Sequence, residues 1–417
     1  MPRMRYSAQW AAPACTDAAE RALILLGLGD NVDYEVIWDE NLLQGRVSAL
    51  GITRADLAQA DIVDQRSLLA SLCQFMATGQ GGERQVASSL VDSFLDGFRW
   101  STTIGGTAPR AAIAMAKVGV GGTLHLTTMN DTVRALLPAS YDYVCSNQDD
   151  HVYPHLIMQY PPGASIRLAD GYRIETRVAN RLIYVNDPDA ETMGIAPAFP
   201  AMVARARLIL LSGLNVMSPG PLLSRRLGSI NQALDGAAPD AVTVLEEAGY
   251  HEAETGRLVR ARLSHRMTVH SMNSEEFTEM AGRKALPGDP AQLAGDVRAV
   301  HAGLGARNIV VHSPGWALAY GPDAPSLLPA LDLGMRLATL RYAVGDGWVA
   351  EGLATLDHTP RSEDGVRLAA WARSHLGSGL AVAAGWDVSV SSPTTIGLGD
   401  TFVAGLMAGL AKSVKRK

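Results

Sequence analysis

Short apolar runs alternate with alanine-rich stretches along most of the chain. Five of these runs are continuous and predict buried strands, at residues 22–28, 208–211, 241–245, 267–271 and 308–312. Residues 111–118 follow a pair of glycines and predict a helix. Buried strands that alternate with helices favour a mostly parallel sheet covered on both faces. We therefore predict a large α/β domain.

Two regions break this pattern, because apolar and polar residues alternate in them. They are residues 32–38 and 156–185, and such alternation is typical of half-exposed antiparallel strands. We predict a small sheet beside the mouth of the large one, where it can act as a lid. The expected division is a large nucleotide-binding domain and a discontinuous lid and substrate domain: 20–31, 105–152 and 193–417 for the first, 32–104 and 153–192 for the second. The Pro/Gly-rich stretch 321–329 is expected to be a loop.

Composition places the chain among ordinary globular proteins. Of its 417 residues, 47% are hydrophobic and 19% are charged, far from a disordered composition. The net charge of −6 argues against nucleic acid as a partner. Cys15, Cys73 and Cys145 are far apart, so we expect neither a disulfide framework nor a zinc site. With no secretory signal and no apolar run of about 20 residues, we expect a cytoplasmic protein without a membrane partner. The oligomeric state stays open.

The strongest signal for chemistry is the glycine turn Gly397-Leu398-Gly399-Asp400-Thr401, which precedes a predicted helix at 402–410. Glycines let a backbone approach a ligand closely, and a helix start directs free N–H groups at an anion. Asp400 repels an anion, so its sensible role is that of a general base for an attacking hydroxyl. The turn predicts phosphoryl transfer in the crevice of a parallel sheet. Its alternative interpretation is a plain helix start, with Asp400 or Thr401 as N-cap.

Two acidic motifs follow predicted strands, where an open parallel sheet forms its ligand crevice. Asn273 and Glu276 are three residues apart, so they share one face of a helical turn and can hold Mg²⁺ through water beside a polyphosphate. The same pair also predicts a capping box, with Asn273 as N-cap, and both roles are compatible. Glu246 and Glu247 end another strand and either serve the same metal or form a solvated pair.

Seven segments resemble motifs of the ADP-dependent sugar kinases, the glucokinases and phosphofructokinases of the ribokinase-like fold. They follow the family's order from about residue 23 to the C-terminus, at 29–33, 105–108, 154–163, 211–213, 272–277, 311–316 and 397–400. The resemblance implies a ribokinase-like large domain with a small β-rich lid. It also implies that ADP phosphorylates a hexose hydroxyl with the help of Mg²⁺.

The resemblance further implies roles for individual residues. The residues in motifs similar to the family's sugar-binding segments are Asn31, Asp33, Gly105, Gly106 and His155. Those in motifs similar to its nucleotide-binding segments and anion hole are His312, Gly397, Leu398 and Gly399. The match to the catalytic base is Asp400, and the matches to the magnesium motifs are Glu246, Asn273 and Glu276.

Three departures from the family pattern surround the expected sugar and metal. Thr107 and Gln159 stand where the family has Gln and Glu, and a family His-x-Glu keeps only Glu246. Two rival functions follow. One is an ATP-dependent ribokinase-like kinase of another sugar or a nucleoside. The other is a weakened homologue that binds a sugar or nucleotide as a sensor, against which the retention of Asp400 argues.

The acceptor depends on the charges of the predicted lid. Glu83 falls where glucokinase-type members carry a glutamate that contacts the sugar, and a carboxylate there suits a neutral polyol and repels a phosphate. Because the chain has only five lysines, the candidate phosphate-binding groups are arginines: Arg110, Arg173, Arg177 and Arg181. The lid arginines also fit a solvated strand face. We expect a glucose-like hexose in preference to fructose 6-phosphate.

Overall fold

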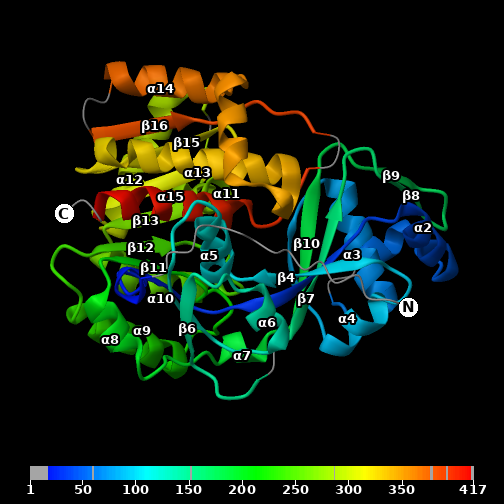
Figure 1. The fold of residues 1–417 in the computed structure, drawn as a ribbon. Coiled ribbons are helices and arrows are strands. Elements are labelled where there is room, and N and C mark those ends of the chain that lie inside the picture. Colours follow the sequence, from blue (N-terminus) through cyan, green and yellow to red (C-terminus); the bar gives the residue numbers. More distant parts are fainter. Residues whose placement is uncertain are drawn as a thin grey trace.

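Two separate sheets organise the computed structural model, which describes residues 17–58, 61–150, 153–285, 287–375, 379–390 and 393–414 (Figure 1). In this part of the chain the large sheet has nine strands, in the order β16-β15-β14-β13-β12-β11-β1-β5-β6. They are β1 (Ile24–Leu26), β5 (Gly122–Leu126), β6 (Tyr141–Cys145), β11 (Leu208–Leu211), β12 (Val242–Glu246), β13 (Val269–Asn273), β14 (Asn308–Ser313), β15 (Trp316–Tyr320) and β16 (Leu380–Ala384). All neighbours are parallel except β15, which is antiparallel to both of its partners. The predicted α/β fold is confirmed.

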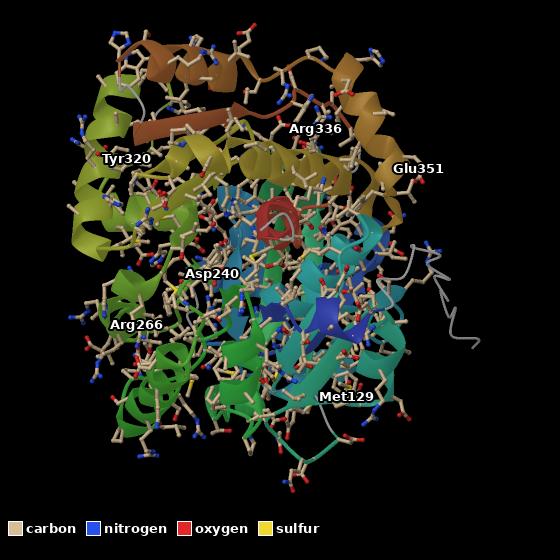
Figure 2. All side chains as sticks on the ribbon, turned by 60° about the vertical axis from the view of Figure 1, so that its left-hand side comes forward. Met129, Asp240, Arg266, Tyr320, Arg336 and Glu351 are labelled. Carbon is tan, nitrogen blue, oxygen red and sulfur yellow. The ribbon has the colours of Figure 1, made fainter. Side chains whose placement is uncertain are left out.

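Helices cover both faces of the large sheet, because its strands are apolar on both sides. Ile24 and Leu26 pack into the core of one face, and Leu25 packs into the core of the other. The first face is covered by α5 (Thr107–Lys117), α13 (Ala324–Val344) and α15 (Leu398–Val414). The second is covered by α8 (Phe199–Arg205), α9 (Pro221–Asp235), α10 (Ala253–Leu263), α11 (Ser274–Ala281), α12 (Pro290–Leu304) and α14 (Glu363–His375). Side chains fill the space between these layers (Figure 2).

The small sheet lies beside the large one and joins strands that are far apart in the sequence (Figure 1). In the order of the sheet these strands are β3 (Gly82–Gln85), β10 (Asn180–Val185), β7 (Pro154–Tyr160), β2 (Asn31–Val36) and β4 (Trp100–Gly105). The expectation of antiparallel strands is only partly right, since β2 is parallel to β7 and β10 is parallel to β3. The helices of its core are α2 (Glu40–Ala49), α3 (Gln65–Thr78) and α4 (Ser88–Phe94).

Shorter elements complete the described chain. A hairpin pairs β8 (Ser165–Arg167) with β9 (Arg173–Glu175). The remaining α-helices are α1 (Ala18–Arg21), α6 (Asp131–Leu136) and α7 (Pro188–Glu191), and the 3₁₀ helices are η1 (Arg54–Ala58), η2 (Ser264–Arg266), η3 (Gly345–Gly347) and η4 (Ala350–His358).

Two expectations about helix boundaries were wrong. The stretch 321–329 is not a loop, because α13 begins at Ala324 and contains Pro329. A proline in the first turn of a helix removes an N–H that has no helical partner, so Pro325 accompanies a helix start, whereas Pro329 lies inside the helix. The last helix begins at Leu398, four residues earlier than predicted.

The described residues also bear on expectations drawn from composition. Cys73 and Cys145 are free thiols, and Cys15 lies outside the described residues. None of the helices in the described ranges combines the length and apolar character of a membrane span.

Candidate active site

The register of the small sheet brings three predicted sugar-binding residues together. Asp33 of β2 is the register partner of His155 on β7, and Asn31 is the partner of Gly105 on β4. The Asn31 amide donates to Asp33 Oδ1 at 2.5 Å and lies 3.0 Å from His155 Nδ1. Asp33 and His155 are both buried. Pairing between strands therefore places a carboxylate, an amide and an imidazole at one point.

Two glycines allow the segment around Asn31, at the start of β2, to pack against the start of α5. A side chain at Gly105 would place its Cβ 2.2 Å from the Asn31 amide nitrogen. Gly106 has φ +87°, and a Cβ there would lie 3.1 Å from the Gly29 carbonyl oxygen. The structure thus places the predicted glycine pair directly against the start of β2 at Asn31.

Arg110 connects this cluster to Asp400. Its Nη2 donates to Asp33 Oδ2 at 2.6 Å and to Glu35 Oε1 at 3.1 Å, and its Nε lies 3.9 Å from Asp400 Oδ2. Burial alone would lower the pKa of Arg110, but Asp33, Glu35 and Asp400 outweigh it and raise the pKa above its usual value. The sequence predicts a phosphate-binding role for Arg110, whereas its partners in the structure are carboxylates.

Asp400 lies in the first turn of α15 and is partly exposed. The Thr401 hydroxyl and backbone N–H both donate to the Gly397 carbonyl, at 2.7 and 3.0 Å. Because the helix begins at Leu398, neither Asp400 nor Thr401 is the predicted N-cap. Gly397 has φ +70°, and a Cβ there would meet Arg110 Nη1 at 2.7 Å and Arg341 Nε at 3.0 Å. Two guanidinium groups therefore flank the glycine turn.

His312 and Glu246 approach the same turn from the large sheet. His312 Nε2 lies 3.1 Å from Glu246 Oε1, and its ring stacks on Phe402 with centroids 4.3 Å apart. A Cβ on Gly399 would lie 3.6 Å from His312 Cε1. Strands β12 and β14 thus place a histidine and a carboxylate beside the start of α15.

Asn273 and Glu276 form the predicted capping box of α11. The Asn273 side chain accepts from the backbone N–H of Glu276 at 2.9 Å, and Glu276 Oε2 accepts from the Asn273 N–H at 2.8 Å. Burial, followed by the repulsion of Glu246, raises the pKa of Glu276 well above its usual value. Glu246 Oε2 is buried and accepts no hydrogen bond from the described residues. Two acidic side chains therefore lie close together at this end of β12 and β13, and without a cation between them the charged form of Glu276 is disfavoured.

The metal site stays a prediction, and the side chains present can be compared with what Mg²⁺ needs. Within the described ranges, no group of three or more His, Cys, Asp and Glu side chains is arranged to hold a metal ion directly. The unpaired Glu246 oxygen and the crowded Glu276 carboxylate nevertheless fit a hydrated Mg²⁺, which keeps several waters and needs few protein groups.

Glu83 of the small sheet contacts a residue that follows a strand of the large sheet. It lies on β3, and its Oε2 is 3.1 Å from Nε2 of His251, which follows β12. The hydrogen bond to Glu83 is the main cause of a raised pKa at His251. The residue expected to contact sugar therefore joins the two sheets in this structure.

Comparisons with known proteins identify the family of this chain. A profile described as "ADP-specific Phosphofructokinase/Glucokinase conserved region" matches residues 22–296. The chain belongs to this family of ADP-dependent sugar kinases. It is accordingly a transferase that acts on an alcohol group, as the sequence resemblance implied. A search of curated proteins finds no match.

Solved structures share the fold of this ADP-dependent sugar kinase at low sequence identity. A phosphofructokinase from Pyrococcus horikoshii OT3 with AMP has a TM-score of 0.71 and 16% identity, over 94% of this chain and 98% of the other. An ADP-dependent kinase in complex with fructose-6-phosphate and ADPβS has a TM-score of 0.73 and 14% identity, over 96% of each chain. The last common ancestor of ADP-dependent phosphofructokinases from Methanosarcinales has a TM-score of 0.69 and 15% identity, over 94% of each chain.

Three residues around the site of this kinase are not singled out by the sequence, namely Asp30, Glu35 and Arg341, and Gln159 is found there only as a departure from the family pattern. Burial raises the pKa of Asp30 to about 7, although the Thr127 and Thr128 amides that it accepts from lower it. Arg341 donates to the Ile396 carbonyl at 2.9 Å, and its Nη2 is buried without a partner among the described residues. Even spacing along a strand could have grouped Glu35 with Asp33 and Gln159 with His155.

Proposed function

We propose that this enzyme transfers the terminal phosphoryl group of ADP to a hydroxyl of a glucose-like hexose and releases AMP. The observation that carries the proposal is the link from Asp33 through Arg110 to Asp400. It joins a sugar-binding cluster on the small sheet to a carboxylate at the glycine-led start of α15. Phosphoryl transfer needs this kind of positioning more than covalent chemistry by the protein.

The reaction assigns a separate task to each side chain. Asn31 and Asp33 bind sugar hydroxyls, and Asp400 takes the proton of the attacking hydroxyl. The hydroxyl oxygen forms a bond to the terminal phosphorus of ADP, while the bond to the bridging oxygen breaks and AMP leaves with the electron pair. Backbone N–H groups of Gly397, Leu398 and Gly399 stabilise the charge of the phosphoryl group in transfer.

We assign the nucleotide and metal to the opposite side of the turn. His312, next to Gly399, faces the nucleotide, and the relatives solved with AMP and with ADPβS support a nucleotide in this fold. Glu246, Asn273 and Glu276 would hold a hydrated Mg²⁺, which neutralises phosphate charge when bound. The unpaired buried Glu246 oxygen supports this assignment.

We also assign a lid role to residues 32–104 and 153–192. Asp33 and His155 lie on the small sheet, whereas Asp400 begins the last helix of the large layer. Movement of one sheet toward the other would bring the hydroxyl to its base and exclude water, which competes as an acceptor.

The charges near Asn31 support a neutral acceptor. Asp33 and Glu35 both accept from Nη2 of Arg110 and balance its charge, so this guanidinium attracts a sugar phosphate less strongly than an unpaired arginine would. A relative solved with fructose-6-phosphate keeps the phosphorylated sugar as the main competing acceptor. Arg181, whose Nε is buried and unpaired in the described structure, is the lid group that would hold such a phosphate.

The deciding experiment is a phosphoryl-transfer screen with Mg²⁺. We expect kcat/KM to be higher for glucose than for fructose 6-phosphate with ADP as donor, and we expect Glu83→Ala to lower the value for glucose. A strong preference for fructose 6-phosphate that Glu83→Ala leaves unchanged would assign specificity to the arginines. Turnover with ATP and none with ADP would assign the protein to the ATP-dependent kinases. Tight binding of a sugar or nucleotide without turnover would assign it to the sensors.

A further inference from the structure

The side-chain amide of Gln159 connects the small sheet to the segment that leads into the catalytic turn. Gln159 lies on β7, and its Oε1 accepts from the Thr395 N–H at 2.8 Å, the Thr395 hydroxyl at 3.0 Å and the Ile396 N–H at 3.3 Å. Gly397 follows at once in the chain. In Figure 1 the N-terminal end of α15 faces the small sheet, which agrees with these contacts. One oxygen of the small sheet therefore accepts from two consecutive backbone amides of the segment that leads into α15.

The same amide also continues into the acceptor cluster. Gln159 Nε2 lies 3.5 Å from Glu35 Oε2, and Glu35 Oε1 accepts from Arg110 at 3.1 Å. On the far side, the Ile396 carbonyl accepts from Arg341, which forms an ion pair with Asp346. A continuous chain of polar contacts thus connects Arg110, the partner of Asp33, to the N–H of Ile396, and the carbonyl of Ile396 is held by Arg341.

We propose that Gln159 is a positioning residue that holds the Gly397–Asp400 turn in place against the sugar-binding strand. The proposal rests on the proposed function, because it assigns to this contact the alignment of the base with the acceptor hydroxyl. Gln159 contacts neither Asp400 nor Asp33 directly; it acts through Thr395, Ile396 and Glu35. Its role needs an acceptor on one side and a donor on the other, which an amide provides and a carboxylate or an aliphatic group does not.

Loss of this contact has a specific kinetic consequence. A turn that is free to shift misaligns Asp400 with the sugar hydroxyl, and a displacement of about 1 Å can cost about 100-fold in rate. Water is a small acceptor that needs less alignment, so its reaction with ADP falls less. The ratio of sugar phosphate formed to AMP released should therefore drop, whereas simple loss of folded protein lowers both products equally.

The first test compares Gln159→Leu with the wild type. We expect sugar phosphorylation to fall by about 10–100-fold, the ratio of sugar phosphate to AMP to fall, and the KM for sugar to change little. The matched control is Gln85→Leu, on an exposed position of β3 in the same sheet, which should leave all three unchanged. An unchanged product ratio in Gln159→Leu would overturn the positioning role.

A second measurement does not depend on catalysis. Hydrogen–deuterium exchange of a peptide covering residues 393–400 should be faster in Gln159→Leu, because the Thr395 and Ile396 amides lose their acceptor. Unchanged exchange would overturn the contact itself. If the wild type phosphorylates no sugar with ADP or ATP, the proposed function fails, and the exchange result still decides whether Gln159 anchors the turn.

An amide–carboxylate exchange sharpens the test and also covers the case in which Gln159→Leu does not fold. Gln159→Glu places a carboxylate beside Glu35, and Glu35→Gln removes the charge that faces Arg110, so each single variant should lose sugar phosphorylation. The double variant restores one amide and one carboxylate, because the amide introduced at position 35 can accept from Arg110 and donate to the carboxylate introduced at position 159. Recovery of the product ratio in the double variant supports the proposal, and double losses that simply add overturn it.

Discussion

The proposed function gives the glycine turn at the start of α15 an acceptor flank, with Asp33 and Glu35, and a nucleotide flank, with Glu246 and Glu276. These two flanks differ in how their charges are balanced. On the acceptor flank, Asp33 and Glu35 share the buried guanidinium of Arg110, at 2.6 and 3.1 Å. On the nucleotide flank, Glu276 is crowded by Glu246, whose Oε2 has no partner among the described residues. A buried carboxylate is stable only when it is paired or hydrogen-bonded. The acceptor flank is thus balanced by the protein's own side chains, whereas the nucleotide flank suits a bound cation.

Asp400 lies between the flanks, so removing its charge should separate binding from chemistry. We expect Asp400→Asn to lower turnover by at least about 10²–10⁴-fold, the range for a lost general base, while sugar and nucleotide still bind. Turnover and calorimetric binding measure the two effects. Asp131→Asn, at a fully exposed carboxylate, is the matched control. Near-normal turnover in Asp400→Asn would show that the base lies elsewhere.

The acceptor flank should be the more sensitive to loss of a charge partner. Arg110→Gln leaves Asp33 and Glu35 buried without a cation, and breaking a buried pair in this way costs about 3–5 kcal/mol of unfolding free energy. Chemical denaturation measures the loss. Arg134→Gln removes an exposed arginine from its pairs with Asp131 and Asp150 and should change stability little. If both variants unfold alike, the acceptor flank is not held together by Arg110.

The sequence predicts the local features of the fold and the site, but not the contacts between the two sheets. Continuous apolar runs such as Leu208–Leu211 identify strands of the large sheet, because a strand covered on both faces is apolar on both. The glycine turn and the capping box of Asn273 are local, so spacing alone finds them. The ion pair of Arg110 with Asp33 depends on where α5 crosses β2, and the contact of Gln159 with Thr395 joins residues 236 positions apart. Such contacts follow from the docking of the sheets, on which local patterns carry no information.

The nucleotide flank should respond to the metal. Glu276→Gln keeps the hydrogen bond to the Asn273 N–H but removes the carboxyl group whose charged form a bound cation would stabilise. We expect the Mg²⁺ concentration for half-maximal rate to rise by about 10–100-fold, the effect of losing a group that supports a bound metal. The control is Glu275→Gln, an exposed neighbour in the same helical turn. An unchanged Mg²⁺ titration would leave Glu276 with its capping role alone.

The smallest expected effect lies at the rim, where Glu83 of the small sheet meets His251 of the large layer. The hydrogen bond to Glu83 raises the pKa of His251 above its ordinary value of 6.5. Because the pKa of His251 is raised in the folded protein, the pair stabilises the folded state fully below pH 6.5. This stabilisation is lost as the pH rises through the raised pKa of His251. Both side chains are partly exposed, so the contribution is at most about 1 kcal/mol.

We expect stability, measured by denaturation at a series of pH values, to decline over this range in the wild type. His251→Gln should flatten the decline, and the exposed His358→Gln should leave it as it is. An identical decline in the wild type and His251→Gln would mean that this contact does not hold the two sheets together, and that Gln159 and Arg110 connect them without it.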